Sequence, residues 1–99
     1  MARYDVFPNP AGPGFLLEMQ TDLLAGLNTR IVVPLLPADR APLAANRLNP
    51  VFDVGGIDHV MVTQFLSALP AALLKAPVAN LGAHFAQITA ALDMLTQGF

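Results

Sequence analysis

The chain has 99 residues, of which 55% are hydrophobic and 12% charged, and its formal net charge is −2. This length suits one domain. Ordinary domains hold about 25% charged residues, so a small core cannot hide all of this apolar surface. No apolar run reaches the roughly 20 residues of a membrane-spanning helix. We therefore expect a single domain over residues 1–99 that covers its excess apolar surface with another protein chain, most simply in a homodimer.

The residue types present in the chain exclude several classes of function. The chain has no cysteine, which excludes disulfides, thiol catalysis and thiolate metal ligands. Its five basic residues are scattered and form no cluster of the kind that binds nucleic acid. The first residues lack the apolar segment of a secretory signal. We expect a cytoplasmic protein that touches neither nucleic acid nor membrane directly.

The N-terminal third predicts short strands between turns. Strands are expected at 3–7 and 15–21, separated by an irregular loop rich in proline and glycine. The segment 22–26 that follows predicts a turn. This turn leaves two apolar side chains, Leu23 and Leu24, near the surface.

The strongest strand signal lies at 30–36, where three consecutive β-branched residues fit a strand buried on both faces. Pro34 has no N–H to give to a neighbouring strand, so we expect it at a bulge or an unpaired edge. The segment 37–49 is expected to be a long irregular connection with room for a helical turn around Ala44.

A β-hairpin is predicted in the next segment. Two apolar runs, 50–54 and 57–63, flank a Gly-Gly pair, and such a pair between strands is typical of a tight hairpin turn. A short last strand is expected at 71–75, between two prolines.

The remainder, 78–99, predicts an amphipathic helix with Asn80 as N-cap and Gly98 just past its end. Apolar residues recur there at alternating spacings of four and three. The expected inner stripe is Leu81, Phe85, Ile88, Leu92 and Leu95. Strands followed by one helix predict a mainly β fold with a C-terminal helix (α+β), built as a small barrel.

No group of residues has the arrangement that catalysis or metal binding needs. His59 and His84 are far apart and have no motif around them. Asp53 and Asp58 flank the predicted turn and fit a solvated hairpin tip better than an acid–base pair. Ser67 has no base beside it. We expect a protein that is not an enzyme, with no catalytic residue, no metal and no cofactor.

Five segments, in order, resemble the CcdB family of toxins. These are Gln-Thr-Asp-Leu-Leu at 20–24, Arg-Ile-Val-Val-Pro-Leu at 30–35, the run 48–52 with the hairpin that follows it to 63, the segment 92–95, and the closing Gly-Phe. The resemblance covers nearly the whole chain and its length also agrees.

This resemblance implies a fold, a function and partners. The fold would be a small SH3-like antiparallel barrel with a terminal helix, of the CcdB/PemK type, that forms a homodimer. The function would be that of the toxin of a type II toxin–antitoxin pair, a class linked to plasmid maintenance. Such a toxin binds the A subunit of DNA gyrase and traps the cleaved-DNA complex, which inhibits the topoisomerase. A CcdA-like antitoxin with a disordered C-terminal segment would neutralise it by folding onto it.

The resemblance also implies which residues contact gyrase: Leu23, Leu24, Asp93, Thr96, Gln97, Gly98 and Phe99. Core or dimer packing is an equally good interpretation of the two leucines, and a helix C-cap is an equally good one of the glycine. A terminal aromatic side chain such as Phe99 is a natural anchor in a partner's pocket.

One position departs from the family pattern. The best-known plasmid members end in Trp-Gly-Ile, whereas this chain has Gln97 where the family has tryptophan. Losing such an anchor costs on the order of 2–4 kcal/mol. Two alternative functions follow: a non-toxic or weakly toxic relative that mainly binds an antitoxin, and a MazF-like ribonuclease toxin on a similar barrel. The scattered basic residues argue against the ribonuclease.

Overall fold

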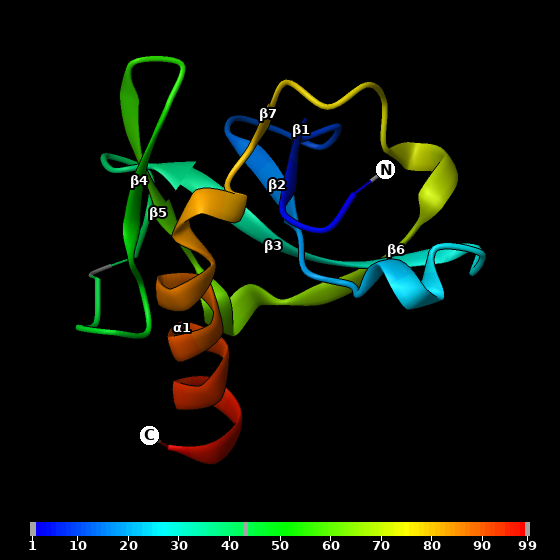
Figure 1. The fold of residues 1–99 in the computed structure, drawn as a ribbon. Helices are drawn as coiled ribbons and strands as arrows, with labels where there is room; N and C mark the ends of the chain where they lie inside the picture. Colours follow the sequence, from blue (N-terminus) through cyan, green and yellow to red (C-terminus); the bar gives the residue numbers. More distant parts are fainter. Residues whose placement is uncertain (1, 43, 99) are drawn as a thin grey trace.

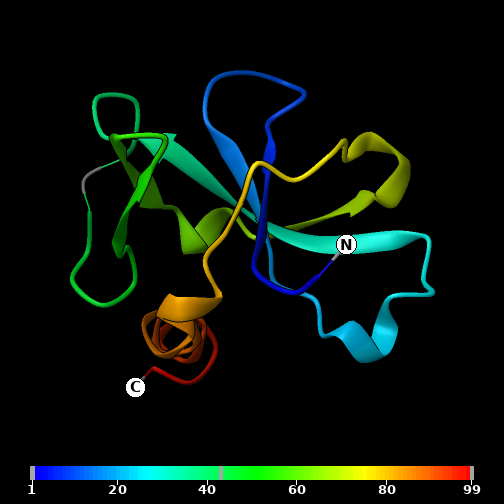
Figure 2. The same cartoon turned by 45° about the horizontal axis from the view of Figure 1, so that its top comes forward.

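The computed structural model describes residues 2–42 and 44–98. Its strands form a nearly closed antiparallel barrel, with one helix packed at the side (Figures 1 and 2). The elements are β1 (Asp5–Pro8), β2 (Phe15–Glu18), β3 (Thr29–Pro37), β4 (Val51–Val54), β5 (Ile57–Met61), β6 (Ser67–Pro70), β7 (Ala79–Asn80) and α1 (Phe85–Gln97). The expected fold class, mainly β with a C-terminal helix, is confirmed.

The sheet is organised around β3. Its strand order is β4-β5-β3-β2-β1-β7, and β6 pairs with β3 off this path. One side of β3 pairs with β2, while the other side pairs first with β6, through 29–32, and then with β5, through 35–37. Pro34 lies in the gap between these two partners, so its missing N–H breaks no ladder bond there. The expected strand is confirmed, and the proline marks a change of partner rather than a free edge.

Alternating side chains of the central strands fill two separate cores. Val6, Leu17 and Val33 are cross-strand neighbours that belong to the larger core, between the sheet and α1. Their chain neighbours point the other way and form a smaller core, which contains Phe7, Leu16, Val32 and Leu74. The central strand is therefore buried on both faces, as its run of β-branched residues predicts.

The β4–β5 hairpin is confirmed, but the predicted strand at 71–75 is wrong. Residues Ala71–Leu73 form a 3-10 turn directly after β6. The pairing of β6 with β3 ends at Thr29, and the Ala71 N–H then donates to the Asn28 carbonyl, which turns the chain away. The last strand is instead β7, which pairs with β1.

Asn80 links the segment before α1 to the N-terminal strand. Its Nδ2 donates to a carboxylate oxygen of Asp5 at 2.9 Å, 75 positions away in the chain, and its Oδ1 accepts from the Gly82 N–H at 2.8 Å. Asn80 therefore bonds to the first residue of a short 3-10 turn, Gly82–His84, whose N-cap position is Leu81, and it is not the N-cap of α1 as predicted. The helix begins later than predicted because 79–80 is recruited into the sheet.

Only part of the predicted helix stripe is buried. Leu81 and Ile88 lie in the larger core, and Leu92 packs against it. Phe85, the first residue of α1, is 60% exposed. Leu95 is 39% exposed because the last turns of α1 extend beyond the sheet (Figure 1).

The helix ends as predicted. Gly98 has a left-handed conformation, with φ of 83°, and its N–H reaches the carbonyls of Asp93 and Met94. In the part of the chain that the structure describes, no helix is long and apolar enough to cross a bilayer.

Candidate protein-binding surface

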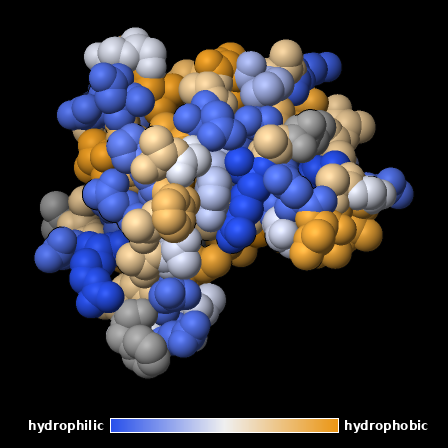
Figure 3. All heavy atoms as spheres, in the orientation of Figure 1, coloured by the Kyte–Doolittle hydropathy of each residue, from blue (hydrophilic) through white to orange (hydrophobic). Residues whose placement is uncertain are grey.

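The most exposed large apolar side chain of the described residues, Leu23, lies on the loop between β2 and β3, residues 21–28, which we call the leucine loop. Leu23 is 92% exposed, and Leu24 and Leu27 are about half exposed. Figure 3 shows an apolar cluster on this side of the molecule, where the loop protrudes. Leu23 and Leu24 therefore face outward, and within this chain they do not pack into a core.

Polar groups around the loop fix its shape. Residues Asp22–Leu24 form a 3-10 turn in which the Leu23 N–H lies 3.4 Å from the Thr21 hydroxyl oxygen. The Asp22 carboxylate accepts from the backbone N–H of Arg3 at 2.8 Å. These bonds explain two polar positions of the motif at 20–24: the threonine and the aspartate shape the turn that displays the leucines.

Two buried side chains hold the loop from beneath. Gln20 donates from Nε2 to the Leu24 carbonyl at 2.9 Å, and its Oε1 accepts from the Ile31 N–H at 3.2 Å. Arg30 donates from its two terminal nitrogens to three carbonyls in and just after the loop, those of Ala25, Leu27 and Thr29. The exposed loop is thus tied to the barrel through its backbone.

Arg30 also faces a buried acid. Its Nε lies 3.7 Å from Oε1 of Glu18, and both side chains are more than nine-tenths buried. Burial raises the pKa of Glu18, and the positive charge of Arg30 lowers it by a smaller amount. Sequence reasoning missed this pair. Its one signal was a charged residue on each of two strands that are otherwise mainly apolar.

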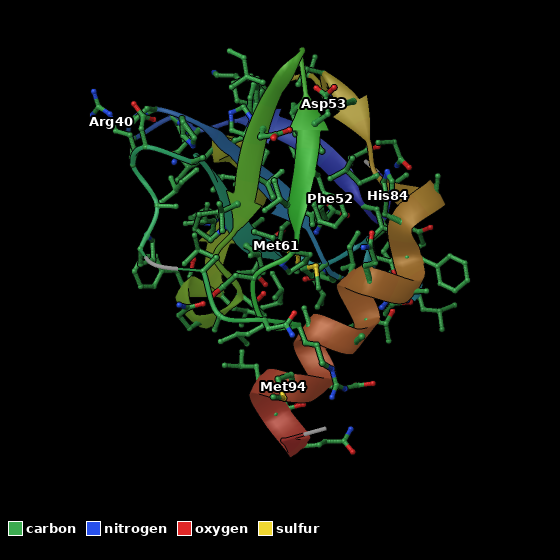
Figure 4. All side chains as sticks on the ribbon, turned by 90° about the vertical axis from the view of Figure 1, so that its left-hand side faces the viewer. Arg40, Phe52, Asp53, Met61, His84 and Met94 are labelled. Atoms are coloured by element: carbon green, nitrogen blue, oxygen red, sulfur yellow. The ribbon has the colours of Figure 1, made fainter. Side chains whose placement is uncertain are left out.

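The second predicted region is the end of α1. Asp93 is half-buried, whereas Thr96, Gln97 and Gly98 are exposed. The Thr96 hydroxyl donates back to the Leu92 carbonyl at 3.0 Å. Figure 4 shows Met94 on these last turns, well away from the labelled strand residues. Phe99 lies outside the described residues.

The structure does not bring the two regions together within one chain. The leucine loop and the end of α1 lie apart in both ribbon views (Figures 1 and 2). A single surface made of both would need a second copy of the chain or a partner large enough to span them.

The groups considered for catalysis have individual structural roles. His59 is buried with its ring 5.0 Å from that of Phe15, and its Nδ1 lies 2.8 Å from the Ile57 carbonyl oxygen. His84 packs against Phe52 at 5.1 Å (Figure 4). Within residues 2–42 and 44–98, no cluster of three or more histidine or acidic side chains could hold a metal.

The hairpin acids are also explained by local structure. The Asp53 carboxylate accepts from the Gly56 N–H at 2.8 Å and so shapes the turn. Asp58 lies opposite it in the β4–β5 register, and both are exposed. Their arrangement fits the predicted solvated hairpin tip.

A cavity of about 460 Å³ lies between the 44–50 connection and α1. Its described lining includes Arg47, Asn49, Gln87 and Ala90. None of the described residues that the family resemblance assigns to gyrase binding lines it, so the leucine loop is the stronger candidate for the binding surface.

Comparison with known proteins matches the chain to a protein family. The family model described as CcdB protein matches residues 3–98. No curated protein matches the chain.

Proposed function

The chain belongs to the CcdB family, and from this we propose that the protein is the toxin of a type II toxin–antitoxin pair. Its target is the A subunit of DNA gyrase, which it binds so that the cleaved-DNA complex is trapped and the DNA is not resealed. The protein acts by binding and is not an enzyme.

The observation that carries this proposal is the leucine loop. Leu23 is 92% exposed on a loop held by buried side chains. An exposed apolar side chain on a fixed backbone gains free energy only when a partner covers it, about 1.5–3 kcal/mol for a leucine. A fixed loop also avoids the entropy cost of ordering on binding. This is the combination expected of an anchor for a protein partner.

The end of α1 supplies the second part of the proposed gyrase surface. Thr96, Gln97 and Gly98 are exposed there, and Phe99 follows them in the sequence. Since the loop and the helix end lie apart in one chain, the proposal includes a homodimer, which would offer gyrase both regions from two copies. A CcdA-like antitoxin would compete for the same surface through its disordered segment.

The test is induced expression in a bacterial host whose gyrase carries an affinity tag. We expect growth arrest and gyrase linked to cleaved DNA. The double variant Leu23→Ala/Leu24→Ala should lose on the order of 100-fold in affinity for the breakage–reunion domain of gyrase, and should permit growth.

The matched control is Ile57→Ala. Ile57 is 61% exposed but lies on the β4–β5 hairpin, on the other side of the barrel from the leucine loop (Figure 1). This variant should remain toxic. Normal growth with abundant, folded wild-type protein and no trapped DNA would contradict the proposal.

A second candidate function is a weakly toxic relative that mainly binds an antitoxin. It is favoured by Gln97, because an amide side chain cannot stack on a partner as the family tryptophan does. Binding of an antitoxin peptide without any effect on gyrase supercoiling would support this candidate over the first.

A further inference from the structure

We propose that Arg30 is the positioning residue of the leucine loop: its buried guanidinium holds the loop backbone so that Leu23 and Leu24 are displayed before any partner arrives. The part of this inference that concerns binding rests on the proposed function. The part that concerns loop order can be tested on the free protein.

The hydrogen bonds of Arg30 all go to backbone carbonyls in the leucine loop or directly after it. Arg30 donates to the carbonyl oxygens of Ala25 and Leu27 at 2.6 Å and of Thr29 at 2.8 Å. Gln20 adds a bond to the Leu24 carbonyl. The second half of the loop thus turns its carbonyls inward, onto buried donors, while its leucine side chains stay outside.

The other groups that order this segment, the Thr21 hydroxyl, the Asp22 carboxylate and backbone bonds within the loop, are not in the core. Its regular structure is one 3-10 turn, Asp22–Leu24, with no buried residue. The leucines are exposed and contribute little packing. Fixing a flexible backbone costs conformational entropy, so a loop without the buried donors would have to bear that cost at the moment of binding.

A guanidinium fits this position better than an ammonium group would. It is a planar fork of five donors that can reach carbonyls in several directions at once, whereas lysine carries its three donors on one atom. The negative ends of three carbonyl dipoles and the Glu18 carboxylate, 3.7 Å from Nε, surround the buried positive charge. These groups stabilise the positive charge of Arg30 at its buried position in the barrel wall.

The experiment compares wild type with Arg30→Lys, which keeps the charge and loses the fork. Hydrogen exchange of the free protein should show the Leu24, Ala25 and Leu27 amides, which bond within the loop, exchanging about tenfold faster or more. Affinity for the breakage–reunion domain of gyrase should fall about tenfold. Gln20→Met, which removes the bond to Leu24, tests the same idea if the lysine variant does not fold.

Two controls separate positioning from general stability. Val54→Ala truncates a buried side chain on the hairpin and should leave the loop amides protected and the affinity unchanged. In a Leu23→Ala/Leu24→Ala background, Arg30→Lys should cost little further affinity, because its effect runs through those side chains.

The inference is overturned if a folded Arg30→Lys protein keeps wild-type exchange in the loop, or if its loss of affinity adds in full to that of the leucine variants. If wild type itself does not bind gyrase while the loop amides respond as expected, the proposed function fails and the positioning role of Arg30 stands.

Discussion

Glu18 is a buried acid whose proton affinity is changed by the fold. It is 3% exposed, and its Oε1 has no hydrogen-bond partner in the described structure. Burial disfavours its charged form more than Arg30 favours it, so the pKa of Glu18 is raised. The folded protein therefore keeps a proton on this side chain to a higher pH than the unfolded chain does.

This shift gives a prediction with a definite sign. As pH rises from the unfolded pKa, near 4.5, through the raised folded value, the unfolded chain releases the proton first and the free energy of unfolding falls. Glu18→Gln removes this loss, so the variant should be more stable than wild type at neutral pH, with the difference vanishing at acid pH. Urea denaturation at several pH values measures it.

Asp58→Asn provides the control for that series, because it removes an exposed carboxyl group and should change stability by no more than about 0.5 kcal/mol. A Glu18→Gln protein that is less stable than wild type at neutral pH would show that the attraction of Arg30 outweighs the cost of burial.

At the scale of elements, α1 ends through a left-handed backbone conformation at Gly98. Gly98 has φ of 83°, and a Cβ added there would meet open space. Gly98→Ala therefore tests backbone strain alone, with an expected loss of about 1 kcal/mol in the free energy of unfolding. Chemical denaturation checks the value. Gly12→Ala, also in open space but without positive φ, should change stability little.

Elements were predictable where the signal is local. The apolar run of β3 and the Gly-Gly turn of the hairpin each specify their structure from a few adjacent residues, and both were confirmed. The start of α1 was not predictable, because residues 79–80 are drawn into pairing with β1, which lies far away in the chain. Tertiary pairing there overrides local helical periodicity.

The candidate site was predictable only in part. The exposure of Leu23 and Leu24 follows from an apolar pair inside a turn. The role of Arg30 could not be predicted, because its three carbonyl partners carry no signature in the sequence and meet the guanidinium only once the loop has folded. Exposure of Leu95 depends on where the sheet ends beneath α1, which helical spacing does not encode.

At the scale of the whole molecule, the exposed apolar residues predict self-association. Phe65, Val78 and Phe85 are each more than half exposed, in addition to the leucine loop. A stable interface needs about 800 Å² from each partner, and covering such side chains supplies the free energy for it. Light scattering at micromolar concentration should give about twice the chain mass of 10.5 kDa. A monomeric mass at that concentration would contradict a homodimer.

The bond between Asn80 and Asp5 has a consequence for synthesis. A ribosome makes the N-terminus first, and β1 cannot acquire its outer neighbour β7 until residue 80 has left the exit tunnel. The leucine loop and its arginine lie within residues 20–30 and emerge early, but β1 gains its second neighbour only after residue 80 has emerged. A nascent chain that has not yet released β7 would therefore leave the outer edge of β1 unpaired, and an unpaired strand edge is prone to pair with other chains.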